Sequence, residues 1–227
     1  MIFGSPSRFA LESSLRLPSD RFVQGTLWLW TRGEQLGDGL ETSLTVPAGF
    51  LGGTLGFRER RIDAALAKLT KEEVVQFLSS VHYGSCEGAS SEEEQARRQY
   101  YNGFIVCAYG SYPPFDDVFA ALVGLPSGER FIWQKRGSPE VREVLLAPGE
   151  FDATVRGFLD WLESETGWKL EGREWLELTE AEREEARHLV LRRKPSLARP
   201  VKRALLEAEA AKDWASRHRK PSLPVRA

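Results

Sequence analysis

Residues 22–31 read Phe22-Val23-Gln24-Gly25-Thr26-Leu27-Trp28-Leu29-Trp30-Thr31, and this stretch indicates the fold class most directly. It is rich in β-branched and aromatic residues, which are enriched in strands. Every position from Leu27 to Trp30 is apolar, so we expect both faces of this strand to be covered. Arg32-Gly33-Glu34 then predicts a short turn into a returning strand. With further strands expected at 1–4 and 8–15, the first forty residues predict an antiparallel meander.

The chain then changes to the spacing of a helix. Thr70-Lys71-Glu72-Glu73 has the pattern of a capping box, and an apolar face follows it as far as Val81. Ser91-Glu92-Glu93-Glu94 repeats the pattern and predicts a short polar helix toward Tyr100. A helix is also expected over 60–69, because apolar residues recur there three and four positions apart: Ile62, Ala65, Leu66 and Leu69.

A second meander is predicted from residue 104 onward. The expected strands cover 104–109, 117–123, 129–134 and 141–146, separated by Gly- and Pro-containing turns. A helix with one apolar face follows over 151–164. We therefore predict an α+β fold in which two antiparallel β meanders form a sheet packed by helices. This domain would span 1–168.

Residues 169–227 are predicted to form a charged helical extension with a basic C-terminal tail. The formal net charge of the chain is −2, but residues 1–186 carry 19 Lys and Arg against 30 Asp and Glu, whereas residues 187–227 carry 12 against 3. An acidic body and a basic tail can attract each other, or each can bind a different partner. We expect the extension to pack on the body, because three tryptophans would otherwise expose large apolar surfaces: Trp168, Trp175 and Trp214.

The sequence also indicates which kinds of chemistry to expect. No apolar run is long enough for a membrane span, no leader peptide is recognisable and there are two cysteines, so we expect a cytoplasmic protein. Gly49-Phe50-Leu51-Gly52-Gly53 lacks the Lys-Ser/Thr of a phosphate-binding loop and is predicted to be a plain loop. His82 and Cys86 are four residues apart, but Gly84 lies between them, so we expect no nucleophile pair. No catalytic residue, metal or cofactor is expected.

Acidic clusters are the remaining candidates for a binding site. Glu92, Glu93 and Glu94 form one cluster, and Asp116 and Asp117 form another. They could dock a basic partner protein electrostatically. The alternative is that they are helix N-terminal charges or a solvated face.

Several segments of the chain resemble the immunity protein 42 family of bacterial polymorphic toxin systems. The resemblance covers about residues 1–165 and stops before the extension. It is carried by the opening Ile2-Phe3-Gly4-Ser5-Pro6-Ser7-Arg8-Phe9-Ala10-Leu11-Glu12, by Thr42-Ser43-Leu44, by Arg130-Phe131-Ile132-Trp133, by Val141-Arg142-Glu143-Val144, by Pro148-Gly149-Glu150-Phe151-Asp152 and by Phe158-Leu159-Asp160-Trp161-Leu162.

The resemblance implies an α+β immunity protein that neutralises a cognate toxin, encoded by a neighbouring gene, through direct stoichiometric binding. The family supplies no catalytic residues, so a non-enzymatic protein is expected. Two alternatives remain open from the residues alone. One is a hydrolase or transferase of unrecognised type, and the other is an adaptor whose basic tail binds nucleic acid or an acidic partner.

Overall fold

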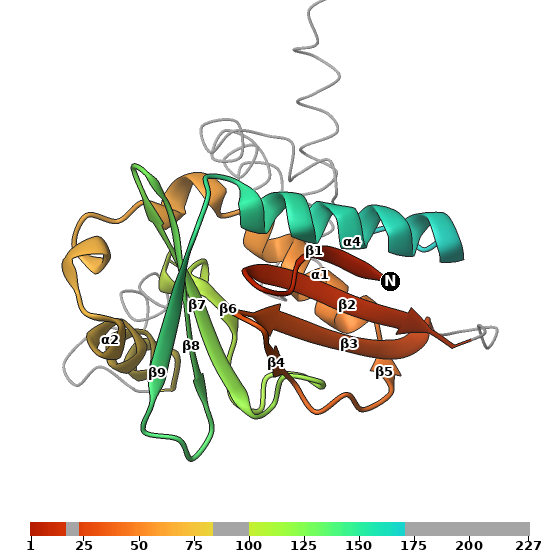
Figure 1. The fold of residues 1–227 in the computed structure, drawn as a ribbon, viewed down its shortest axis with the longest axis horizontal. Helices are drawn as coiled ribbons and strands as arrows, with labels where there is room; N and C mark the ends of the chain where they lie inside the picture. Colours follow the sequence, from red (N-terminus) through yellow and green to blue (C-terminus); the bar gives the residue numbers. More distant parts are fainter. Residues whose placement is uncertain (17–22, 84–99, 171–227) are drawn as a thin grey trace, which may run out of the picture. The chain divides into compact units, whose positions relative to one another are not determined.

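The computed structural model describes residues 1–16, 23–83 and 100–170 (Figure 1). These residues belong to one compact unit, Met1–Leu170. The helix expected after Ser91 and the extension beyond 170 lie outside the described residues, as do Trp175 and Trp214. Their structure stays a prediction.

The first meander forms an antiparallel sheet in the order β1-β2-β3-β4. Its strands are β1 (Ile2–Ser5), β2 (Phe9–Leu15), β3 (Gln24–Thr31) and β4 (Glu34–Leu36), and the short β5 (Thr42–Ser43) pairs with β3. Arg32 and Gly33 connect β3 to β4 with φ angles of 52° and 77°. Two successive positive φ angles are the geometry of a type I′ hairpin turn, whose twist suits the two strands.

Burial alternates along β3, which corrects one expectation. Leu27, Leu29 and Thr31 are buried, whereas Trp28 and Trp30 are only half-buried. The sheet therefore has a core face and an outer face, and the prediction that both faces of this strand are covered is wrong. Antiparallel sheets commonly leave one face toward solvent.

The second meander forms a separate antiparallel sheet in the order β6-β7-β8-β9. Its strands are β6 (Ile105–Cys107), β7 (Val118–Leu125), β8 (Gly128–Lys135) and β9 (Val141–Leu146). β7 is buried over nearly its whole length, because both faces of this sheet are covered. The α+β class and the two meanders are confirmed, but the meanders make two sheets instead of one.

Helix α2 (Lys71–Tyr83) packs on one face of the second sheet through Val74, Val75 and Leu78. The predicted capping box starts this helix as expected. Thr70 Oγ1 accepts a hydrogen bond from the Glu73 amide at 3.2 Å, and the Thr70 amide donates to Glu73 Oε2 at 2.8 Å. These bonds satisfy two amide groups that the first helical turn would otherwise leave unpaired.

Helix α4 (Glu150–Thr166) runs along β1 and β2 and joins the two sheets (Figure 1). Phe3 of β1 contacts Phe158 of α4 with ring centroids 5.9 Å apart. At the start of the helix, Phe151 lies 5.1 Å from Phe9 of the first sheet and 6.5 Å from Phe131 of the second. This aromatic cluster is the common core of both sheets.

Two predictions about the intervening segment are wrong. The expected loop at 49–53 lies inside helix α1 (Thr45–Leu55), which packs against α4 and β6. The burial of Ala48, Leu51 and Leu55 at helical spacing outweighs the low helix propensity of three glycines.

The helix expected over 60–69 is replaced by two short 3-10 turns, η1 (Arg58–Arg61) and η2 (Leu66–Lys68). Asp63 Oδ1 accepts hydrogen bonds from the amides of Ala65 and Leu66, at 2.8 and 3.0 Å. This local side-chain bonding competes with a continuous helix. Ile62, which the helix was expected to bury, is 63% exposed.

Candidate functional site

The acidic clusters predicted as a docking surface are placed only in part. Asp116 and Asp117 lie in the loop before β7, where their backbone carbonyls accept hydrogen bonds from the amides of Gly110 and Arg136. Asp117 is exposed, whereas Asp116 Oδ1 is buried and has no hydrogen-bond partner among the described residues. Glu92, Glu93 and Glu94 lie outside the described residues. The acidic docking surface therefore stays a prediction.

The histidine and the cysteine that the structure describes form no nucleophile pair. His82 Nδ1 lies 3.1 Å from Asn102 Oδ1, and Cys86 is outside the described residues. The free thiol of Cys107 is buried in β6, and this burial raises its pKa well above the ordinary value of 9.0. A thiol with a raised pKa carries little thiolate at neutral pH, so Cys107 is a poor nucleophile.

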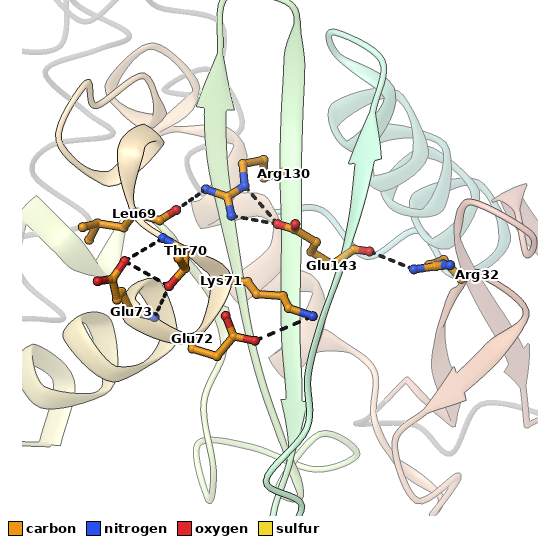
Figure 2. A network of polar contacts seen from close by, with 8 residues as sticks. All are labelled: Arg32, Leu69, Thr70, Lys71, Glu72, Glu73, Arg130 and Glu143. Atoms are coloured by element: carbon orange, nitrogen blue, oxygen red, sulfur yellow. Dashed lines mark hydrogen bonds and ion pairs between the residues drawn. The ribbon is translucent and has the colours of Figure 1, made fainter.

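Charged side chains converge where the outer edge of the second sheet meets the first sheet (Figure 2). Arg130 of β8 donates to Glu143 Oε2 of β9 from Nε at 3.0 Å and from Nη2 at 2.8 Å, and its Nη1 donates to the Leu69 carbonyl at 2.9 Å. From the β3–β4 turn, Arg32 Nη1 donates to the Glu143 carbonyl at 3.4 Å. Glu143 of β9 is thus bound by residues of two other segments, and Arg130 links it to the segment before α2.

Glu34 of β4 continues this polar seam between the sheets. Its carboxylate lies 2.9 Å from Lys135 Nζ and 2.7 Å from Arg142 Nη1, and Arg142 Nη2 also lies 2.7 Å from Glu140. Partial burial raises the pKa of Glu34, but the hydrogen bonds and charges of Lys135 and Arg142 outweigh it, so the pKa lies below its ordinary value. The seam borders a cavity of about 470 Å³. Since its carboxylates pair with its own basic residues, we interpret the seam as a connection between the sheets.

A second ionic cluster, around Arg61, is buried in the core. Arg61 of η1 is 1% exposed, and its Nη2 lies 2.6 Å from Asp152 Oδ1 of α4 and 3.5 Å from Glu129 Oε1 of β8. Arg58 Nε approaches Asp152 Oδ2 at 3.2 Å, and the Arg61 guanidinium lies 5.5 Å from the centre of the Phe151 ring. Burial, together with the nearby Asp152 carboxylate, raises the pKa of Glu129, although Arg61 opposes the shift. The cluster fixes η1 between the second sheet and α4.

An apolar pocket of about 530 Å³ lies between α1, the end of α2 and β6. Phe50 of α1 is 50% exposed and stacks on Tyr112, with ring centroids 4.4 Å apart and an angle of 8° between the rings. His82 and Asn102 are among the few polar residues of its lining. Such a pocket can accept an apolar side chain or a small apolar molecule.

The outer face of the first sheet is the fourth candidate site. Trp28 and Trp30 are two residues apart on β3 and project from the same face, because side chains alternate along a strand. Trp30 Nε1 donates to Glu12 Oε2 of β2 at 2.7 Å. Sequence analysis missed this surface, since the continuous apolar run suggested a strand covered on both faces.

Two kinds of site are not found among the described residues. In that part of the chain, no three His, Cys, Asp or Glu residues are grouped as a metal site requires. None of its helices is both long and apolar enough to cross a membrane.

Comparison with known proteins decides the family. The family model described as immunity protein 42 matches residues 1–161. The chain belongs to the immunity protein 42 family. The predicted resemblance is thereby confirmed, and with it the function of an immunity protein of a toxin system.

One solved structure shows the same fold as this immunity protein. It is CdiI from Burkholderia dolosa AUO158, which matches with a TM-score of 0.57 and 23% sequence identity. The match covers 71% of this chain and 99% of the CdiI chain. No curated protein matches the sequence. The residues matched by the family model, 1–161, all precede the extension.

Membership of an immunity protein family changes the weight of the four candidate sites. An immunity protein acts on another protein, so exposed surfaces that a partner can reach matter more than enclosed titratable groups. The polar seam pairs its carboxylates with its own basic residues, and the Arg61 cluster is enclosed in the core. The apolar pocket and the outer face of the first sheet both leave aromatic side chains partly exposed, as protein interfaces require.

Proposed function

We propose that this immunity protein neutralises its toxin by direct stoichiometric binding and leaves the toxin chemically unchanged. The observation that carries the proposal is the match to the immunity protein 42 family over residues 1–161, which is nearly the whole compact unit. The toxin that we propose as partner is the product of a neighbouring gene. The name of the CdiI neighbour makes a toxin of contact-dependent inhibition the first candidate class.

The chemistry of the described residues is consistent with binding. The buried thiol of Cys107 has a raised pKa, and the clustered carboxylates of the polar seam are engaged by Arg130, Arg142 and Lys135. A group held in an ion pair is a weak proton acceptor, since its charged form is stabilised. We infer that the protein acts by covering a surface of the toxin.

We also propose that binding takes place in the cytoplasm. The low cysteine content supports a reducing compartment, because proteins of oxidising compartments often rely on disulfides. Cys107 is a free, buried thiol.

A titration of toxin activity tests this function. The purified toxic domain of the neighbouring gene product is held at a concentration well above the dissociation constant, and the full chain is added in steps. Stoichiometric binding predicts that activity falls linearly and ends at one chain per toxin. If much less than one equivalent inactivates the toxin completely, and the extent of inactivation grows with incubation time, the chain modifies the toxin catalytically instead.

A further inference from the structure

The register of the first sheet defines one continuous outer face. Cross-strand partners in an antiparallel sheet point their side chains to the same side. Glu12 is paired with Ile2 on one side and with Trp28 on the other, so these three residues form one row across the face. The next row holds Ala10, Trp30 and Gln35.

This face offers both apolar surface and polar groups for which the described residues supply no hydrogen-bond partner. Ile2 is 49% exposed, and Trp28 and Trp30 are half-buried. Glu12 Oε2 accepts the Trp30 N–H, but among the described residues neither Glu12 Oε1 nor Trp28 Nε1 has a hydrogen-bond partner. A half-buried indole with a free N–H is suited to the centre of a protein interface.

Two carboxylates, Glu12 and Asp38, lie at or beside the two tryptophans, and Lys135 Nζ reaches the Gln35 carbonyl at 3.4 Å. Gly39 packs closely against the Trp28 indole: a Cβ atom added to Gly39 would lie only 2.6 Å from Trp28 Nε1. Asp38, the residue before Gly39, is therefore at the border of the face. Arg16 pairs with Glu41 at 2.8 Å, which leaves Glu12 and Asp38 without an ion-pair partner in the described chain. The sequence of the compact unit, 1–170, also has an acidic balance, with 17 Lys and Arg against 23 Asp and Glu.

We propose that this outer face, which we call the tryptophan face (Ile2, Glu12, Trp28, Trp30 and Gln35), binds a basic segment of the toxin. Arginine or lysine side chains of that segment lie over the indole rings of Trp28 and Trp30, and one of them pairs with Glu12. Indole rings attract cations through their π faces, and a carboxylate at the same place adds a charge-assisted hydrogen bond. This inference rests on the proposed function, because it names the surface through which the toxin is bound.

The variants Glu12→Gln and Glu12→Lys test the tryptophan face. Glu12→Gln keeps an oxygen for the Trp30 N–H and removes the charge, and Glu12→Lys reverses it. Binding of the full chain to the purified toxic domain of the neighbouring gene product is measured by calorimetry. We expect Glu12→Gln to weaken binding about 30-fold and Glu12→Lys much more, because truncating one partner of a buried charge pair costs at least this factor. The control Glu72→Gln, on the exposed side of α2, should bind within about twofold of wild type.

The outcomes separate this inference from the proposed function. If the wild-type chain does not bind the toxic domain, the proposed function fails before the face is tested. If wild type binds and all three variants bind equally well, with unchanged melting temperatures, the tryptophan face is not the interface. Loss of self-association of the chain in Glu12→Lys, with unchanged affinity for the toxin, would overturn the inference by assigning the face to a second copy of the chain.

Footprinting provides a measurement that does not depend on how the variants fold. Hydroxyl radicals oxidise exposed tryptophans, and mass spectrometry locates the products. We expect Trp28 and Trp30 to be oxidised several-fold more slowly in the complex, while Trp161 on α4 changes little. Unchanged oxidation of Trp28 and Trp30 in a saturated complex would contradict the inference.

Discussion

Glu129 is a residue on whose pKa burial and a neighbouring charge act in opposite directions: burial raises the pKa and Arg61 lowers it. It is 8% exposed on β8, near Asp152, and its Oε1 lies 3.5 Å from Arg61 Nη2. A buried carboxylate without full compensation destabilises the charged form, which explains why its pKa lies above the ordinary 4.5. The folded chain therefore holds a proton at Glu129 more tightly than the unfolded chain does.

This raised pKa predicts a pH-dependent difference between wild type and Glu129→Gln. The stabilising effect of the proton is fully present below pH 4.5 and is lost as the pH rises through the folded-state pKa of Glu129. The free energy of unfolding of wild type should therefore fall relative to that of Glu129→Gln as the pH increases from acidic to neutral. Urea unfolding of both proteins across this range measures the difference. If the difference in the free energy of unfolding between the two proteins does not change with pH, Glu129 has the same pKa in the folded and the unfolded chain, which would contradict the prediction.

Individual residues could be predicted where the signal is local. Thr70 and Glu73 are three positions apart, so the sequence alone indicates the hydrogen bonds that they make. The half-burial of Trp28 and Trp30 could not be predicted in this way. Which face of β3 is buried depends on the elements that pack against it, and these elements are distant from β3 in the sequence.

At the scale of elements, α1 shows how tertiary packing overrides local propensity. Its glycines suggested a loop, yet Leu51 and Leu55 are buried at helical spacing. The helix expected over 60–69 failed for the opposite reason, because Asp63 bonds to nearby amides and Ile62 forms a single parallel bridge to Gly124. Segments with strong local signals, such as α2, α4 and β9, were located within a few residues.

Gly49 allows a test of the claim that residues 45–55 form a helix despite their glycines. An ideal Cβ at Gly49 would meet no atom within 4 Å, so Gly49→Ala adds no clash to the helix. We expect the free energy of unfolding to rise by about 0.5–1 kcal/mol, because alanine loses less backbone entropy in a helix than glycine does. Gly52→Ala is the matched comparison and should gain less, since its Cβ would lie 2.6 Å from Leu170 Cδ2. Urea unfolding measures both, and a loss of stability in Gly49→Ala would contradict the helical assignment.

At the scale of the whole molecule, the sequence indicated the α+β class, the two meanders and the family. It did not indicate that the meanders form separate sheets. That arrangement depends on the contacts of Phe9, Phe131 and Phe151, which come from three elements, and on ion pairs such as Glu34 with Arg142 that cross between the sheets. Pairings over such sequence distances have no local pattern that reveals them.

The central claim concerns the whole molecule: the toxin is neutralised because it is bound, and it is not altered. The most direct test is native mass spectrometry of an equimolar mixture of the full chain and the toxic domain. The two proteins are then separated under denaturing conditions, and the toxin is refolded and assayed. The account predicts a 1:1 complex, a separated toxin of unchanged mass and full recovery of its activity. A toxin that stays inactive, with an altered mass and no detectable complex, would contradict it.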